Sequence, residues 1–268
     1  MIARTLQIAR RWWGYRFFVK STIKHDFRAR YARSKLGMLW ALIQPLALVL
    51  IYALILSQLF QTKLPATETI YAYPIYLMSG MLAWTLFTEA LNRGLGLFIE
   101  HGELIKKVAF PKALLPAIAF GSAAINGIAL LLMMLVVFLF LGHWPDAHYL
   151  WLPGLIVLAL WFGLSIGLFL GLIHVFFRDI GQAVPVVLQF LFWLTPIVYA
   201  LSMLPPEYHI YYAMNPATHL TGAFQDVILY QTNPSLGSLA GLAGIALVFT
   251  GLSAVLYTRV KHELADHL

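Results

Sequence analysis

The chain has 268 residues, of which 61% are hydrophobic and only 11% are charged. A soluble domain carries about 25% charged residues because its surface faces water, so we expect a polytopic membrane protein. There is no cysteine, which excludes disulfides, cysteine-ligated metal sites and a thiol nucleophile.

Charge-free apolar stretches predict six membrane spans, because a helix needs about 20 apolar residues to cross the hydrocarbon core. The expected spans are residues 37–60, 70–88, 117–141, 153–177, 181–201 and 236–258. Between the last two spans, residues 205–231 are more polar and contain Pro216. They are predicted to form short interfacial or re-entrant helices, because irregular backbone at membrane depth needs cover. The predicted fold is thus an all-α integral membrane protein, with residues 1–268 in one domain.

The lysines and arginines lie almost entirely on one side of the six predicted spans. Of the 18 lysines and arginines, 17 fall in the termini and alternate loops, and only Lys63 falls on the other side. The positive-inside rule places both termini in the cytoplasm. Topology therefore explains the net charge of +7, and we expect no nucleic-acid partner.

Residues 1–36 precede the first span and are rich in arginine. Apolar side chains recur there along one helical stripe, at Ile2, Leu6, Ala9, Trp13 and Phe17. This spacing predicts an amphipathic helix lying in the membrane interface. A basic flank that serves only as a topology anchor is the alternative.

We interpret the sequence as lacking enzyme signatures, the Gly-x-Ser-x-Gly pattern of hydrolases included. The sequence contains no Walker A loop and no zinc-type histidine pair, so it predicts neither an ATPase site nor a metal site on this chain. Glu89, near the cytoplasmic end of the second span, is the only acid within a confident span boundary. Proton-coupled carriers usually need several intramembrane acids, so this class is disfavoured.

The loop after the second span contains a short segment, residues 102–112, that looks helical. Glu103 and Lys107 are spaced to pair on a helix, and Pro111 ends the segment. Its apolar residues suggest a docking surface on the cytoplasmic side. A loop folded against its own domain explains them equally well.

Aromatic residues are concentrated near the outer ends of the spans. An aromatic belt at the lipid interface accounts for most of them. The alternative is a sugar path, because flat rings stack on sugars without requiring one hydroxyl pattern. The candidate path or gate residues are Trp40, Tyr52, Tyr73, Trp84, Gln189, Trp193, Tyr199 and Tyr211.

Five stretches resemble, in order, the ABC-2 type permeases that export polysaccharides and teichoic acids. They are "RARYARSKLGMLWALIQPL", "SGMLAWTLFTEAL", "LIKKVAFPKALLP", "FRDIGQAVPVVLQFLFWLTPIVY" and "NPATHLTGAFQDVIL". Together they span nearly the whole chain. The chain is most similar to the O-antigen type, followed by the teichoic acid type.

The resemblance implies a homodimer in the bacterial inner membrane, paired with two copies of a cytosolic ATPase that holds the ATP and Mg. No cofactor would bind this chain. The N-terminal helix and the loop would meet the ATPase, the loop through Leu104, Ile105, Lys106, Lys107, Phe110 and Pro111. Residues 205–231 would form external gate helices, and the first and fifth spans a lateral opening.

The implied substrate is a polysaccharide on an undecaprenyl pyrophosphate carrier. Arg28, Arg30, Arg33 and Lys35 precede the first span at headgroup level, where they could bind the pyrophosphate. Topology and contact with anionic lipids explain the same cluster. The alternatives for function are a teichoic acid or capsule exporter, an ABC-2 drug or lipid exporter, and an enzyme that modifies lipid carriers.

Overall fold

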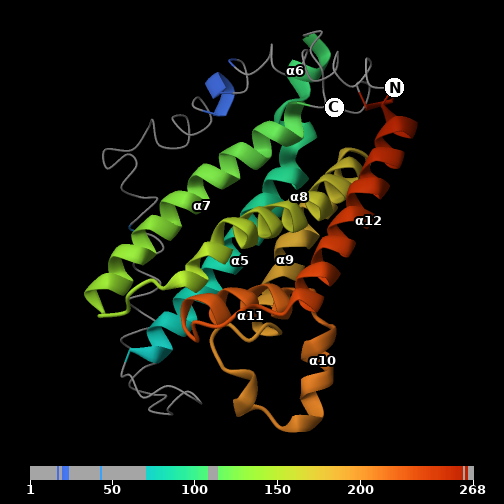
Figure 1. Ribbon diagram of the computed structural model, residues 1–268. Helices are drawn as coiled ribbons and strands as arrows, with labels where there is room; N and C mark the ends of the chain where they lie inside the picture. The colour runs from blue at the N-terminus through green and yellow to red at the C-terminus, as the bar shows by residue number, and fades with distance from the viewer. Residues whose placement is uncertain are drawn as a thin grey trace, which may run out of the picture.

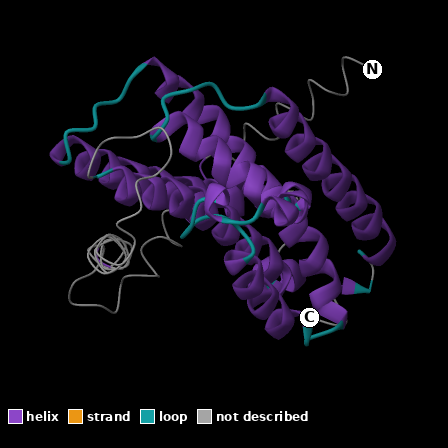
Figure 2. Ribbon diagram, turned by 90° about the horizontal axis from the view of Figure 1, so that it is seen from below, coloured by secondary structure: helices purple, strands orange, loops and turns teal. Residues whose placement is uncertain are grey.

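The computed structural model describes Phe17, residues 20–23, Ile43, and residues 71–107, 114–261 and 263–264. Most of the N-terminal segment and of the expected first span lies outside the described residues. The predictions for Arg28, Arg30, Arg33, Lys35, Trp40 and Tyr52 therefore lie outside them too. Within the described part, all regular structure is helical (Figure 2).

Eight α-helices are found in the described residues 71–107 and 114–261. They are α5 (Ala72–Glu100), α6 (Gly102–Lys107), α7 (Leu114–Phe140), α8 (Leu152–Phe176), α9 (Ile180–Trp193), α10 (His209–Met214), α11 (Pro216–Ile228) and α12 (Leu236–Val260). Short 3-10 turns cover Ala147–Trp151, Leu201–Met203 and Pro206–Tyr208. Helices α6 and α10 lie at opposite ends of the molecule (Figure 1).

Three described helices are long and apolar enough to cross a membrane by length and composition: α7, α8 with its preceding turn, and α12. They lie where the third, fourth and sixth spans are predicted. Much of the apolar surface of α7 and α12 is exposed, for example Leu132, Val136, Leu247 and Val248. Such surface suits contact with lipid chains.

Helix α5 corrects the predicted second span. The prediction ended at residue 88, but α5 continues to Glu100. Arg93, assigned to a cytoplasmic loop from the sequence, lies inside this helix. Its Nη2 is 3.1 Å from Glu89 Oε1, and both side chains are less than one-fifth exposed. At about 1.5 Å per residue, the 29-residue helix is about 43 Å long.

Helices α5 and α8 approach until their backbones touch. Gly163, Gly167 and Gly171 recur every fourth residue along one stripe of α8. A Cβ on Gly167 would lie 2.2 Å from the carbonyl oxygen of Leu91, which is closer than any real contact. Small residues at this spacing permit close helix packing in membranes. The close packing of α5 and α8 therefore requires glycine at these positions, because glycine has no side chain.

The interpretation that the chain lacks a Gly-x-Ser-x-Gly pattern is wrong. The same stretch contains it at residues 163–167, and it marks the nucleophile of many serine hydrolases. That chemistry needs a serine exposed on a sharp turn between strand and helix. Here Ser165 is buried in the middle of α8, and its hydroxyl donates to Phe162 O at 2.9 Å. The pattern serves helix packing.

Helix α12 packs on α8 through both polar and aromatic contacts. Trp161 Nε1 donates to Thr250 Oγ1 at 3.2 Å, and Ser253 Oγ donates to the Ser165 carbonyl at 3.4 Å. The rings of Phe169 and Phe249 meet edge to face with centroids 5.6 Å apart. These contacts fix α12 along α8 while much of its remaining surface is exposed.

The predicted fifth span, residues 181–201, is wrong as a single helix. Helix α9 has 14 residues and is about 21 Å long, short of a hydrocarbon core of about 30 Å. It ends at Trp193, and Pro196 follows in a turn where it has no N–H to continue the helix. Thr195 Oγ1 instead donates to Leu191 O at 2.7 Å and closes the last turn.

Candidate functional site

The turn after α9, residues 194–200, lies at the centre of the candidate site. Its carbonyl groups are bound by side chains from two other helices. From α5, Tyr73 donates to Val198 O at 2.8 Å, and Tyr76 donates to Pro196 O at 3.0 Å. From α11, Gln225 Nε2 donates to Pro196 O at 3.2 Å. The turn is thus held by hydrogen bonds that replace those of a continuous helix.

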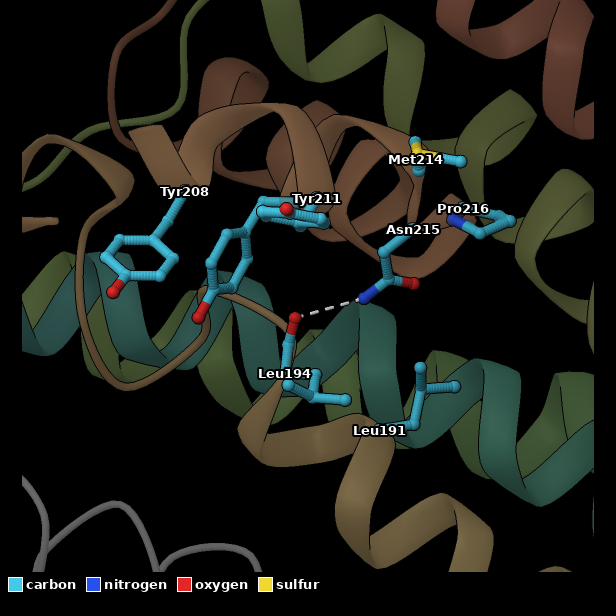
Figure 3. Close-up of a pocket in the computed structure, with 8 residues that line it drawn as sticks. Leu191, Leu194, Tyr208, Tyr211, Met214, Asn215 and Pro216 are labelled. Atoms are coloured by element: carbon cyan, nitrogen blue, oxygen red, sulfur yellow. Dashed lines mark hydrogen bonds between the residues drawn. The ribbon is translucent and has the colours of Figure 1, made fainter. Parts of the chain in front are cut away.

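Asn215 joins the end of α9 to the start of α11. Its Oδ1 accepts from Ala217 N at 3.0 Å, which caps α11, and Pro216 occupies the first helical position. Its Nδ2 donates to Leu194 O at 3.1 Å (Figure 3). It also donates to Thr195 Oγ1 at 3.0 Å. The Asn215 side chain therefore forms hydrogen bonds both with the end of α9 and with the start of α11.

A cavity of about 720 Å³ lies beside this junction. It is lined by Leu191, Leu194, Tyr208, Tyr211, Tyr212, Met214, Asn215 and Pro216. The tyrosines come from α10 and the turn before it, and the two leucines from the end of α9 (Figure 3). Among the described residues, the lining is aromatic and aliphatic with one amide and without a charged side chain. These groups suit a neutral ligand that offers both apolar faces and hydroxyls.

Tyr199 does not line the cavity itself but contacts Tyr212, which does. Its hydroxyl donates to Trp193 O at 2.6 Å and lies 3.1 Å from the Tyr212 hydroxyl. The two rings meet edge to face, with centroids 6.2 Å apart. Tyr199 therefore orients Tyr212, which lines the cavity.

The remaining predicted path residues divide into two groups. Tyr211 lines the cavity and is 69% exposed, while Gln189 and Trp193 are exposed on α9. Tyr73 and Trp84 are buried against their neighbours, at 6% and 9% exposure. These two side chains do not line the cavity, and their part in a path stays a prediction.

Several residues that build the site were not predicted from the sequence. They are Tyr208, Tyr212, Asn215 and Gln225. The Asn-Pro pair at 215–216 is a usable sequence signal, because asparagine is a favoured helix N-cap and proline a favoured first residue. Nothing local in the sequence indicates Gln225.

The predicted docking segment is helical over Gly102–Lys107, as α6. Lys106 is exposed on this helix. The backbones of Leu104, Ile105 and Lys107 lie in α6, and Phe110 and Pro111 lie outside the described residues. A partner's contact with α6 remains an expectation.

One hydrogen-bonded pair of titratable side chains lies in the loop between α7 and α8. The side chains of Asp146 and His148 are hydrogen-bonded, and Asp146 Oδ1 also accepts from His148 N at 3.1 Å. The hydrogen bond from the His148 side chain holds the pKa of Asp146 below its usual value. Across the described residues, no cluster of three or more histidines and acids could hold a metal ion.

The fold and the site define a helical membrane protein with a tyrosine-lined cavity at a broken helix. The family model for the ABC-2 type transporter matches residues 18–229, and the chain belongs to this family. The resemblance seen in the sequence is thereby confirmed.

Curated relatives match along nearly their whole length. The chain is 26% identical over 265 residues to the O-antigen export system permease protein RfbA of Myxococcus xanthus, covering 98% of this chain and 100% of that protein. It is 28% identical over 261 residues to a protein of the same name from Klebsiella pneumoniae, with 95% and 96% covered. It is 24% identical over 246 residues to the polysialic acid transport protein KpsM of Escherichia coli, with 91% and 93% covered.

Proposed function

We propose that this chain is the permease subunit of an ABC exporter that carries O-antigen-like polysaccharide, linked to undecaprenyl pyrophosphate, across the bacterial inner membrane. The observation that carries the proposal is the tyrosine-lined cavity beside the break after α9. The names of the full-length relatives support the same class of substrate.

The cavity chemistry fits sugars. A tyrosine side chain has a flat apolar ring and a polar hydroxyl. The ring can therefore pack on the apolar face of a sugar while the tyrosine hydroxyl forms hydrogen bonds with sugar hydroxyls. Tyr208 and Tyr211 are both more than half exposed and need little rearrangement to contact a ligand. A polymer that slides past needs contacts of this tolerant kind, and a charged lining would bind it too tightly at one repeat.

The pyrophosphate needs a different site, because none of the described residues that line the cavity is a cation. We assign it to the basic cluster Arg28, Arg30, Arg33 and Lys35 on sequence grounds. Arginine binds phosphate oxygens in a bidentate fork, which suits the headgroup level of the cytoplasmic leaflet. The head group would thus be bound at one end of the permease and the glycan at the other.

The proposed complex contains two copies of this chain and two copies of a cytosolic ATPase that binds ATP and Mg. Helix α6 and the residues just after it form the proposed docking surface for the ATPase. Lys106, exposed on α6, suits a polar contact with such a partner. In this arrangement the chain itself hydrolyses nothing.

Export of a capsular polysaccharide is the second candidate, supported by the similarity to KpsM over 91% of the chain. The two candidates differ in substrate and share the cavity and the partner. A teichoic acid exporter, a drug or lipid exporter and a lipid-carrier enzyme have no such support from the curated relatives.

The test is a deletion strain in the native organism, complemented with the chain and its ATPase subunit. We expect surface O-antigen to disappear on deletion, lipid-linked glycan to accumulate inside, and both effects to reverse on complementation. Loss of capsule with intact O-antigen would support the second candidate. Normal surface glycan of both kinds after deletion would contradict the proposal.

A further inference from the structure

Helix α5 connects the two ends of the molecule. At one end it leads through His101 into α6, the proposed docking helix, and at the other it begins beside the turn after α9 (Figure 1). It is continuous over 29 residues, and most of them are buried. A helix without a break transmits a displacement of one end to the other.

The outer end of α5 is fastened to the backbone of that turn. Tyr73 and Tyr76 lie in the first two turns of α5, and both are nearly fully buried. Their hydroxyls bind carbonyls at Val198 and Pro196, and the Tyr76 hydroxyl also lies 3.2 Å from Tyr199 O. Three carbonyls within residues 196–199 thus lie within hydrogen-bonding distance of α5 side chains, and Gln225 of α11 shares the Pro196 carbonyl.

The packing around these bonds leaves little freedom. A Cβ on Gly80 of α5 would lie 2.8 Å from Gln225 Nε2 and 3.3 Å from Ile197 Cγ2. Ile197 itself is completely buried. The turn is therefore held between α5 and α11 and follows either helix if it moves.

The turn after α9 also positions side chains that line the cavity. Leu194 lines the cavity directly, and Tyr199 orients Tyr212, which also lines it. Asn215 bonds to Leu194 and Thr195 and lines the cavity as well. A displacement of residues 195–199 relative to α10 would change the shape of the cavity.

We infer that Tyr73 and Tyr76 are positioning residues that couple the cavity to α5, so that movement of α6 at the cytoplasmic end opens or closes the outer cavity. The inference rests on the proposed function, because it requires an ATPase that moves α6. It gives Tyr73, a predicted path residue, and Tyr76 a role that involves no contact with substrate.

The chain contains no cysteine, so a single introduced cysteine can report on the cavity. Met214 lines the cavity and is 76% exposed, which suits Met214→Cys as the reporter. The measurement is the rate of labelling by a charged maleimide, in the complete complex in nanodiscs, with and without a non-hydrolysable ATP analogue. We expect the nucleotide to change the rate about fivefold or more, as ordinary coupling energies imply.

The variant Tyr73→Phe/Tyr76→Phe keeps both rings and removes only the hydroxyls. We expect it to assemble, to label at the parental rate without nucleotide, and to lose most of the nucleotide response and of export. Tyr76→Phe alone should lose part of the response and serves if the double variant assembles poorly. Tyr71→Phe is the matched control, because Tyr71 precedes α5 and is 48% exposed.

Three results would overturn the inference. The first is a full nucleotide response in the double variant. The second is an altered labelling rate without nucleotide, which would mean that the hydroxyls only shape the resting cavity. The third is no nucleotide response with the tyrosines intact while export is normal, which would leave the proposed function standing. Absence of glycan export by the parent would instead remove the proposed function.

Discussion

Asn126 of α7 donates through Nδ2 to Glu89 Oε1 of α5 at 2.5 Å. This hydrogen bond joins the two helices that flank the segment containing α6. Glu89 also pairs with Arg93, one turn along α5, at 3.1 Å. The bond therefore belongs to a small polar cluster within an apolar bundle, and such clusters are costly to disrupt.

Replacing Asn126 with alanine should destabilise the protein. A hydrogen bond to a charged group contributes about 1.5–3 kcal/mol, and Asn126→Ala removes one donor from the Glu89 carboxylate. We expect a lower melting midpoint for the detergent-solubilised protein, followed by size-exclusion chromatography after heating. Ile125→Ala, on the exposed face of the same turn, should lower the midpoint less. Equal midpoints for Asn126→Ala and the parent would contradict the role of this bond.

We expect opposite effects for two glycine substitutions. Gly167 lies in the α5–α8 contact, and Gly251 lies on α12. Gly167→Ala should destabilise the fold, because its methyl group would lie 2.2 Å from Leu91 O and would force the helices apart. Gly251→Ala should be neutral or stabilise by up to about 1 kcal/mol, since no atom lies within 4 Å and alanine favours helix. The same melting assay checks both. A harmless Gly167→Ala would disprove the close packing.

The cavity predicts a difference between two changes at one residue. Tyr211→Ala should reduce export several-fold, because an aromatic contact contributes about 1 kcal/mol. Tyr211→Phe should keep most of the activity, since the ring remains. Surface glycan of the complemented deletion strain, measured by immunoblot, checks both. Tyr71→Ala controls for general loss of aromatic surface, and equal export by the parent and Tyr211→Ala would argue against a sugar path.

The proposed docking surface predicts loss of the ATPase from the complex. Lys107→Glu, or Phe110→Asp, should reduce co-purification of the ATPase, because each puts a negative charge on the proposed contact. Lys261→Glu, just after the end of α12, is the charge-matched control. Full co-purification and coupled ATP hydrolysis in the loop variants would show that the ATPase binds elsewhere.

The Asp146–His148 pair predicts a pH-dependent contribution to stability. A carboxyl group whose pKa is lowered by folding stabilises the folded state above its unfolded value, 3.8, and loses this contribution as the pH falls through the lower folded value. At neutral pH the melting temperature of the parent should therefore be higher than that of Asp146→Asn. This difference in melting temperature should disappear in acid. Melting curves between neutral pH and the acid range check this. A gap that persists in strong acid would point to a different cause.

Sequence patterning predicted three helices closely. The third, fourth and sixth expected spans differ from α7, α8 and α12 by three residues or fewer at either end. Their ends coincide with changes from apolar to polar residues. A run of apolar residues with polar flanks is sufficient to specify a helix of this length, because lipid leaves no other partner for the backbone groups.

The two errors have tertiary causes. The second span was ended before a charge, but α5 continues through Glu89 and Arg93 because they pair with each other and Asn126 of α7 donates to Glu89. The fifth span was continued across an apolar run, but α9 ends at Trp193 because the following carbonyls find partners on α5 and α11. In each case the deciding partner is a side chain that periodicity does not reveal.

The sequence by itself determined the class of protein, most helix positions and the family, because composition and apolar run length reflect the solvent that surrounds the chain. Only the tertiary structure decided where helices end inside the bundle and which tyrosines face a cavity. Tyr73 and Tyr211 are the same residue type on the same expected side of the membrane. One is buried with its hydroxyl bound to Val198 O, and the other is 69% exposed beside the cavity. Their roles differ because each depends on neighbours that are distant in the chain.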